Sequence, residues 1–239
     1  TNNIEKVSKE GIIYTAILSP QGKYLFDFFV FSLGIKETFI DIHQSRAEAF
    51  KKFLEFYKLN SDVTIFDKEC QVVLSSVQQE TYSFADPRAN ILGWRCYDFN
   101  AEFANERRGF EEFETNRIKS LIPESGVELI PEKSYILELN FEKIKGVDFK
   151  KGCYIGQENT ARIKLKDKLL KRLFSIKVLD GNFSDEANIK DDNLDIGKML
   201  IFDDYPFAVI KFRDKNFKFE KSYKCGEAII KVQKQTWLT

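Results

Sequence analysis

The chain has 239 residues, of which 43% are apolar and 14% aromatic, so it can bury a substantial core as one large domain or two closely packed ones. Lys and Arg together number 37, as do Asp and Glu, and this zero formal net charge argues against a protein that mainly coats nucleic acid or an anionic membrane. No apolar run approaches the roughly 18 residues that a bilayer span requires, so no membrane partner is expected.

The cysteines and the single histidine exclude several kinds of site. Cys70, Cys96, Cys153 and Cys225 are widely spaced and form no CxxC pair, which is unlike zinc and cluster-binding motifs and suits a reducing compartment. His43 is the only histidine, so a Ser–His–Asp triad would depend on it and a multi-histidine metal site cannot be built. We therefore expect no stably bound metal.

The first part of the chain predicts strands followed by a helix. Residues 11–18 are β-branched and apolar, a turn follows at 19–22, and residues 23–33 resume strand character, which indicates an antiparallel hairpin; residues 38–42 predict a third strand. Ser45 and Glu48 then have the spacing of a capping box. The expected helix has an apolar face at helical spacing, made by Phe50, Phe53, Leu54 and Tyr57.

The middle of the chain mixes both element types. Strand character returns at residues 62–66, 72–77 and 91–99, and a second helix is expected over about 105–121, ended by Pro123. Strands and helices that alternate irregularly favour an α+β fold over a doubly wound sheet.

The character changes after about Leu169. Short strand-like runs separated by polar turns occupy residues 172–179, 195–202, 207–212 and 226–232. No helical period of useful length interrupts them, which predicts a small β-barrel or sandwich at the end of the chain. The charged residues 164–171 would connect it to the preceding part.

The most distinctive stretch is Lys150-Lys-Gly-Cys-Tyr-Ile-Gly-Gln-Glu-Asn-Thr-Ala-Arg-Ile-Lys164. Gly152 and Gly156 bracket Cys153, which lets the backbone pass close to another surface or ligand. A short helix over 157–165 would place Cys153 near a helix N-terminus and beside Lys151, and both features favour a thiolate. A thiolate can attack, be oxidised reversibly or bind iron; the structural interpretation is that Cys153 is a small buried side chain.

This stretch resembles the K-G-C-Y-x-G-Q-E signature of the YgfZ family, whose members are relatives of the glycine-cleavage aminomethyltransferase. Further landmarks of that family follow in order across almost the whole chain. They are Ser19-Pro-Gln-Gly-Lys-Tyr-Leu-Phe-Asp-Phe28, Asp86-Pro-Arg88, Gly93-Trp-Arg95, Ile122-Pro-Glu124, Leu137-Glu-Leu-Asn140 and Asp195-Ile-Gly197.

The resemblance implies a fold. It is α+β, with a folate-binding body of mixed, mainly antiparallel sheets and helices, followed by a C-terminal β-barrel. Residues 1–165 would form the body as two intertwined subdomains, and residues 166–239 the barrel. The start of the chain would lie inside a T-N-D-like motif, with the family's N-terminal segment missing. Asn3 stands where an acidic residue is common, which weakens the case for folate chemistry there.

The resemblance also implies a function, that of a tetrahydrofolate-binding accessory factor for the assembly or repair of iron–sulfur clusters. Its partners would be folate, assembly proteins and client enzymes, including tRNA-modifying ones, in a bacterial cytoplasm or a mitochondrial matrix. Cys153, with Lys151, would be the reactive centre and a transient iron ligand. The contacts to tetrahydrofolate or a derivative would come from Glu138, Asp27, Tyr154, Gln157, Glu158, Arg162 and Arg95.

Other interpretations remain open at this level. A folate-dependent aminomethyltransferase is the alternative function, although kinship of fold does not transfer activity. Arg95 and Arg162 could instead form surface salt bridges, and Asp27 could serve only to interrupt an aggregation-prone strand. An RNA-binding module is a third possibility, although the zero net charge argues against it; it would use the C-terminal residues Lys211, Phe212, Arg213, Lys215, Phe217 and Lys218.

Overall fold

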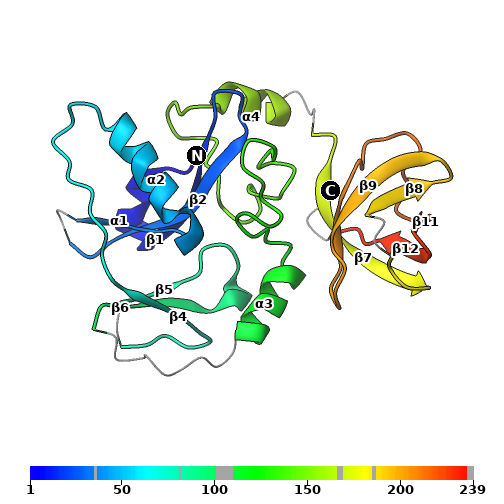
Figure 1. Ribbon diagram of the computed structural model, residues 1–239, viewed down its shortest axis with the longest axis horizontal. Coiled ribbons are helices and arrows are strands. Elements are labelled where there is room, and N and C mark those ends of the chain that lie inside the picture. The colour runs from blue at the N-terminus through cyan, green and yellow to red at the C-terminus, as the bar shows by residue number, and fades with distance from the viewer. Residues whose placement is uncertain (35–36, 81, 101–109, 166–168, 185–186, 236–239) are drawn as a thin grey trace.

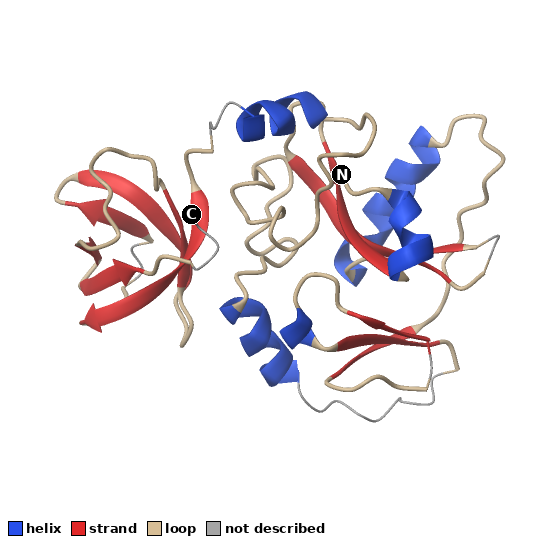
Figure 2. Ribbon diagram, turned by 180° about the vertical axis from the view of Figure 1, so that it is seen from behind, coloured by secondary structure: helices blue, strands red, loops and turns tan. Residues whose placement is uncertain are grey.

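The fold combines an α+β body with a C-terminal β-barrel, which stand side by side in Figures 1 and 2. The computed structural model describes residues 1–34, 37–80, 82–100, 110–165, 169–184 and 187–235. Two three-stranded antiparallel sheets lie in the body, and six strands close the barrel. The fold class expected from the sequence is confirmed.

The first sheet has the strand order β1-β2-β3 and follows two short helical turns, η1 (Ile4–Lys6) and α1 (Val7–Glu10). Its strands are β1 (Ile12–Leu18), β2 (Tyr24–Ser32) and β3 (Thr38–Asp41). They agree with the predicted strands to within one residue at each end. β-branched and aromatic residues pack well on a pleated surface, and this accounts for the agreement.

α2 (Gln44–Tyr57) covers one face of this sheet. Its buried Phe50 packs on Phe26 and Phe28 of β2, with ring centroids 5.2 and 4.8 Å apart. The predicted capping box is wrong, because His43 is the N-cap and its ring Nδ1 accepts from the backbone N–H of Ser45. The Ser45 hydroxyl is hydrogen-bonded to the same ring nitrogen, so it does not cap the backbone N–H groups of the first turn.

The second sheet has the order β4-β6-β5 and comprises β4 (Gln71–Ser75), β5 (Tyr82–Ala85) and β6 (Trp94–Asp98). A short turn, η2 (Asn90–Leu92), precedes β6. The predicted strand at 62–66 is wrong, since this segment begins with a bend at Asp62 and pairs with no other described strand. Phe31 of β2 stacks on Tyr97 of β6 at 4.1 Å, which joins the two sheets.

α3 (Phe110–Lys119) is the second predicted helix, and its expected start at 105–109 falls outside the described residues. The chain after it turns sharply because the buried Arg117 guanidinium donates to the carbonyl of Ile122, just before Pro123. Residues 120–156 then form turns rather than helices or strands. They contribute much of the central core, including Ile122, Leu129, Ile136, Leu139 and Phe141.

The barrel has the strand order β10-β7-β12-β11-β8-β9. Four of its strands correspond to predicted runs: β7 (Arg172–Asp180), β9 (Leu194–Ile201), β10 (Phe207–Ile210) and β12 (Ala228–Val232). Two four-residue strands were not predicted, β8 (Asn188–Asp191) and β11 (Ser222–Cys225). The barrel interior is filled by side chains, among them Phe174, Ile189, Ile196, Ile210, Tyr223 and Ile230.

The barrel and the body share a core. Leu169, Leu173 and Phe207 belong to the same buried cluster as the body's central loops. The backbone N–H of Leu173 donates to the carbonyl of Glu138 at 3.0 Å, which fixes the start of β7 against the body.

Candidate functional site

Cys153 lies in the turn before α4 (Gln157–Leu165), which sits at the top of the body in Figure 1. The helix spans the residues that the sequence predicts. Cys153 is exposed, whereas Cys96 and Cys225 are buried and Cys70 is half-buried. The interpretation of Cys153 as a small buried side chain is therefore wrong, and its thiol is accessible to another molecule.

Gly156 explains how the signature is held. Its φ of +81° is a conformation that glycine adopts without strain, and a Cβ here would lie 2.5 Å from the carbonyl oxygen of Ser19. Asn159 of α4 also donates to the carbonyl of Gln21 at 2.9 Å. The start of α4 thus packs directly on the turn between β1 and β2. Gly152 has no neighbour within 4 Å, so the expected close approach occurs at Gly156 alone.

The residues before Cys153 are fixed by hydrogen bonds and one ion pair. Asp148 accepts from the backbone N–H of Lys150 at 2.8 Å and pairs with Lys6 at 3.0 Å. The first of these interactions, helped by Lys6, lowers the pKa of Asp148. The hydroxyl of Thr1 donates to Gly146 O, and the side-chain amide of Asn2 donates to Lys145 O. These contacts tie the loop to the N-terminal residues.

The residues around Cys153 separate into two groups. Gln157 holds the turn, because its side-chain oxygen accepts from the backbone N–H of Tyr154 at 3.1 Å. Tyr154 is half-buried, burial raises its pKa, and the Lys151 ammonium lies 5.3 Å from its ring centroid. Glu158 and Arg162 are exposed, and no ion pair joins either of them to another described residue. The salt-bridge interpretation of Arg162 has no support in the described part of the chain.

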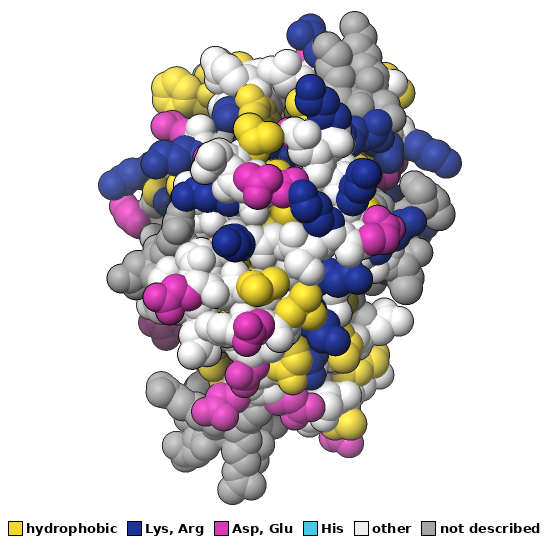
Figure 3. Space-filling model, turned by 90° about the vertical axis from the view of Figure 1, so that its right-hand side faces the viewer, with side chains coloured by type: hydrophobic (Ala, Val, Ile, Leu, Met, Phe, Trp, Pro, Cys, Tyr) yellow, Lys and Arg dark blue, Asp and Glu magenta, His cyan; other side chains and the backbone are white. Residues whose placement is uncertain are grey.

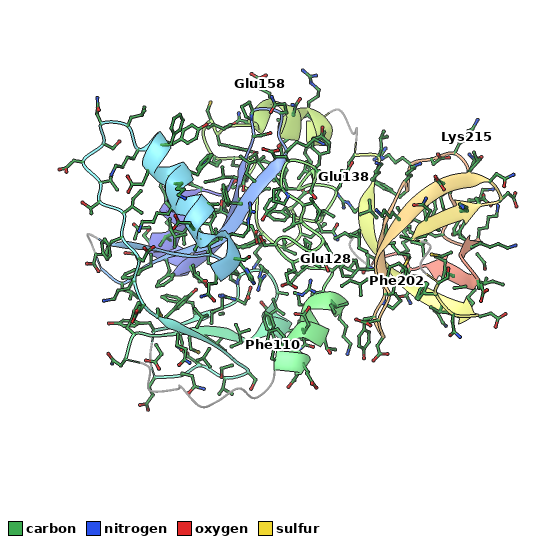
Figure 4. The ribbon with its side chains drawn as sticks, in the orientation of Figure 1. Phe110, Glu128, Glu138, Glu158, Phe202 and Lys215 are labelled. Atoms are coloured by element: carbon green, nitrogen blue, oxygen red, sulfur yellow. The ribbon has the colours of Figure 1, made fainter. Side chains whose placement is uncertain are left out.

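Glu138 forms a second centre, among the body's loops that face the barrel (Figure 4). Burial raises the pKa of this half-buried carboxyl, and the charges of Lys171 and Lys23 offset part of the shift. No hydrogen bond or ion pair joins the carboxylate to another described residue. The Lys23 ammonium is instead held 3.5 Å over the Tyr135 ring and donates to Lys133 O. Glu138 therefore keeps its acceptor capacity for a ligand.

Asp27 lies in a third, more enclosed centre. A register shift between Ile17 and Leu18 of β1 brings Tyr24 and Asp27 of β2 to the same side of the sheet. Tyr14 and Tyr24 donate to the two carboxylate oxygens of Asp27 at 2.7 and 2.6 Å, and Ser125 bonds the Tyr24 hydroxyl at 2.7 Å. Asp27 thus has built-in partners and does more than interrupt a strand.

Arg95 is committed to an internal ion pair. Its guanidinium donates to Asp41 at 2.5 and 3.1 Å, and the Tyr97 hydroxyl donates to the same oxygen at 2.9 Å. Arg88 is held bidentately by the buried Asp86, at 2.7 and 3.0 Å. Burial opposes the ionisation of Asp86, but Arg88 and Arg95 outweigh it and lower the pKa.

The three centres of the predicted site are not directly bonded to one another. No hydrogen bond or ion pair links Cys153, Glu138 and Asp27 within the described part of the chain. The sequence reasoning missed several contributors, namely Tyr14, Tyr24, Lys23, Arg88 and Lys171. Lys23, Tyr24 and Arg88 stand inside landmarks quoted from the sequence, so those landmarks were the available signal.

The two phenylalanines that suggested RNA stacking already contact other aromatic rings. Phe217 is buried and Phe212 half-buried; Phe217 stacks on Tyr223, and Phe212 contacts Phe174. On the barrel side of the molecule, Lys and Arg gather in the upper half of the view and Asp and Glu in the lower half (Figure 3). The burial of Phe217 argues against its stacking on bases, whereas Phe212 keeps part of its surface exposed.

Among the described residues, no group of three or more His, Cys, Asp or Glu side chains is placed to hold a metal ion. No helix in the same ranges has the length and apolar character to cross a membrane.

The fold is that of the aminomethyltransferase-like proteins. The crystal structure of glycine cleavage system aminomethyltransferase T from Bartonella henselae matches with a TM-score of 0.67 over 94% of this chain and 75% of that one, at 12% sequence identity. At this identity the likeness concerns the fold alone. No protein-family model matches the chain.

The sequence is similar to mitochondrial proteins named iron–sulfur cluster assembly factor IBA57. It is 30% identical to that of Mus musculus over 69% of this chain and 53% of that protein. It is 29% identical to that of Homo sapiens over 70% of this chain and 54% of that protein. It is 28% identical to the homolog of Mycosarcoma maydis over 75% of this chain and 49% of that protein. The chain thus spans about half the length of the curated relatives it matches.

Proposed function

We propose that this chain is a YgfZ-like, tetrahydrofolate-binding accessory factor that supports the assembly or repair of iron–sulfur clusters in client enzymes. The observation that carries the proposal is the exposed thiol of Cys153, in a signature loop fixed on both sides. The similarity to proteins named iron–sulfur cluster assembly factors supports the same role. Its place would be the mitochondrial matrix of a eukaryote or the cytoplasm of a bacterium.

In this role Cys153 would exchange with a partner's thiol or bind iron transiently. A lone cysteine cannot supply the four ligands of a typical cluster, so the remaining ligands would come from assembly proteins or clients. Lys151, two residues before Cys153 and held near the Tyr154 ring, would contribute a positive charge to the surface that a partner meets. Client enzymes would include those that modify tRNA.

The first test concerns this thiol. We expect Cys153→Ala to leave circular dichroism and unfolding midpoint unchanged but to abolish rescue of cluster-dependent enzyme activity in a strain that lacks the endogenous protein. Cys70→Ala is the matched control and should rescue fully, because burial raises the pKa of that half-buried thiol to about 11. Full rescue by Cys153→Ala would remove the basis of the proposed mechanism.

Tetrahydrofolate would be bound at Glu138. A carboxylate can accept paired hydrogen bonds from a 2-amino-pyrimidinone edge, and this one has no partner among the described residues. Asp27 already accepts from two tyrosines, so it would contribute through the hydroxyls it orients. Arg95 is occupied by Asp41, which leaves the exposed Arg162 as the freer of the two predicted arginines for a ligand carboxylate.

The second test is calorimetric titration with tetrahydrofolate. Glu138→Gln should weaken binding about tenfold to a hundredfold, since it removes hydrogen bonds to a charged acceptor. Glu227→Gln, at an exposed position in the turn between β11 and β12 of the barrel, is the control and should leave the affinity unchanged. Equal affinity of the Glu138 variant and the wild type would exclude this carboxylate from the site.

The alternative is a folate-dependent aminomethyltransferase; the chain shares the fold of the Bartonella henselae protein of that name, but kinship of fold does not transfer activity. The two functions separate in one assay. An aminomethyltransferase would form methylenetetrahydrofolate and release ammonia from an aminomethylated lipoyl carrier protein. We expect neither product, and their appearance would reverse the ranking.

A further inference from the structure

The zero net charge of the chain conceals an uneven distribution of charge. Residues 150–165, 171–172 and 211–221 contain 11 Lys and Arg but only three Asp and Glu, so these segments carry a net charge of +8 and the remainder of the chain carries −8. The first segment holds the Cys153 loop and α4, and the last is the loop between β10 and β11. Figure 3 shows Lys and Arg gathered in the upper half of the barrel side, and Figure 4 places Lys215 of the last segment on this upper side. We call the three segments the basic strip.

Charge interactions join the segments of the basic strip into one surface. Lys164 at the end of α4 and Arg172 at the start of β7 both pair with Glu142. Burial lowers the pKa of Arg172, and the positive charge of Arg213 in the β10–β11 loop lowers it further, while Glu142 opposes both. The two guanidiniums therefore lie near each other, and α4 is linked to the barrel loop through β7. Like charges held together in this way repel, and a bound polyanion would relieve the repulsion.

Aromatic rings are interleaved with these cations. Three basic side chains lie 5.3–5.5 Å from the centroid of an aromatic ring: Lys151 over Tyr154, Lys164 over Phe149 and Arg213 over Phe212. Phe149 is 41% exposed, and the other two rings are half-buried. Nucleic acid bases stack on accessible rings of this kind while neighbouring cations bind the phosphates. An acidic protein would need the cations but not the rings, so the combination favours nucleic acid.

We propose that the basic strip binds single-stranded nucleic acid, with its phosphates held by the Lys and Arg side chains and a base stacked on the exposed ring of Phe149. A single strand is required because the bases of a duplex are already stacked and paired. This binding goes beyond the proposed function and does not use the thiol of Cys153.

The test is the binding of a fluorescently labelled polyuridylate RNA of about 20 nucleotides, followed by fluorescence anisotropy. The affinity of the wild type should fall roughly a hundredfold between about 50 and 200 mM salt, as expected for about five phosphate contacts. A triple variant of exposed cations in the β10–β11 loop should bind at least about tenfold more weakly: Arg213→Gln, Lys215→Gln and Lys218→Gln. The matched control removes as many exposed charges from α1, α2 and the segment before β4 and should bind like the wild type: Lys9→Gln, Lys52→Gln and Lys68→Gln.

Stacking separates nucleic acid from an acidic protein. Phe149→Ala should weaken RNA binding about fivefold or more, because the base loses its ring, but should not change the binding of a polyglutamate peptide of the same length. Phe110→Ala is the control, since Phe110 is 68% exposed on α3, on the lower side in Figure 4, and should leave both affinities unchanged. Cys153→Ala should bind RNA like the wild type, which keeps this test separate from that of the proposed function.

Three results would overturn the proposal. They are an RNA affinity that does not depend on salt, equal losses of affinity in the two triple variants, and an RNA duplex that binds as tightly as the single strand. Tighter binding of polyglutamate than of RNA would assign the strip to an acidic protein instead. Polythymidylate DNA of the same length shows which nucleic acid is preferred, because only RNA offers the 2′-hydroxyl.

Discussion

Glu138 combines partial burial with a carboxylate that has no partner among the described residues, and this has a consequence for stability. Because burial raises its pKa, ionisation costs the folded state free energy. The group's contribution to stability is complete below the unfolded-state pKa of about 4.3 and is lost as the pH rises through the higher folded-state value. An ionisable carboxyl at a position where its charge lowers the stability of the fold fits a role in binding, because functional residues often lower stability.

We therefore predict that Glu138→Gln is more stable than the wild type at neutral pH and that the difference closes below about pH 4. Glutamine cannot ionise, so the variant avoids the cost that the wild type carries. Urea unfolding over this pH range measures the effect. The same measurement on Glu227→Gln, at an exposed turn position in the barrel, is the control. A neutral-pH loss of stability in Glu138→Gln would mean that the carboxylate is already paired.

At the level of elements, the signature depends on how α4 meets the turn between β1 and β2. A side chain at Gly156 would strain a backbone at φ +81° and place Cβ 2.5 Å from Ser19 O and 2.9 Å from Leu18 Cβ. Strain of this kind costs about 1–3 kcal/mol. The helix would have to move away from the turn, and the Cys153 loop would move with it.

Gly156→Ala should accordingly lower the free energy of unfolding by about 1–3 kcal/mol and increase hydrogen exchange in the loop around Cys153. Gly152→Ala is the natural control, because nothing lies within 4 Å of the position and its φ is not in the left-handed region. It should change stability by less than about 0.5 kcal/mol. Equal effects of the two variants would show that close packing at Gly156 does not hold the loop.

The same elements show how far the sequence could lead. α4 and the first three strands were predictable because their local patterns agree with the contacts they make. The segment at 62–66 has strand composition, but composition cannot supply a neighbouring strand. β8 was missed for the opposite reason: only Ile189 among its four residues is buried, and closure of the barrel provides the pairing.

The candidate site divides in a similar way. Cys153 could be identified from a contiguous motif, and the structure adds that its thiol is exposed. The surroundings of Glu138 could not be found in this way, since Lys23 and Lys171 come from distant parts of the chain. Arg95 was assigned to a ligand because sequence does not reveal that Asp41 is its neighbour. Long-range packing decides which charges remain free.

For the whole molecule, the central question is whether body and barrel behave as one unit. Leu173 on β7 is fully buried in the core cluster that includes Leu137 and Phe141 of the body. Its backbone N–H donates a hydrogen bond to the carbonyl of Glu138, and the side-chain amide of Asn140 donates to its carbonyl. Lys119 of α3 lies 4.2 Å over the ring of Tyr205 in the barrel. A shared core of this kind couples the two parts energetically.

We predict a single unfolding transition for the chain, and a cost of about 2–5 kcal/mol for Leu173→Ala, which empties a site at the junction. The two parts can be followed by different signals in a Trp237→Phe background, which leaves Trp94 as the only tryptophan. Trp94 fluorescence then reports the second sheet of the body, and far-ultraviolet circular dichroism includes the barrel strands. Both signals should shift together in Leu173→Ala. Ile176→Ala, in the barrel's own core, is the matched control and should also move both signals if coupling is complete. Two resolved transitions, with Leu173→Ala shifting only circular dichroism, would show that the body folds without the barrel.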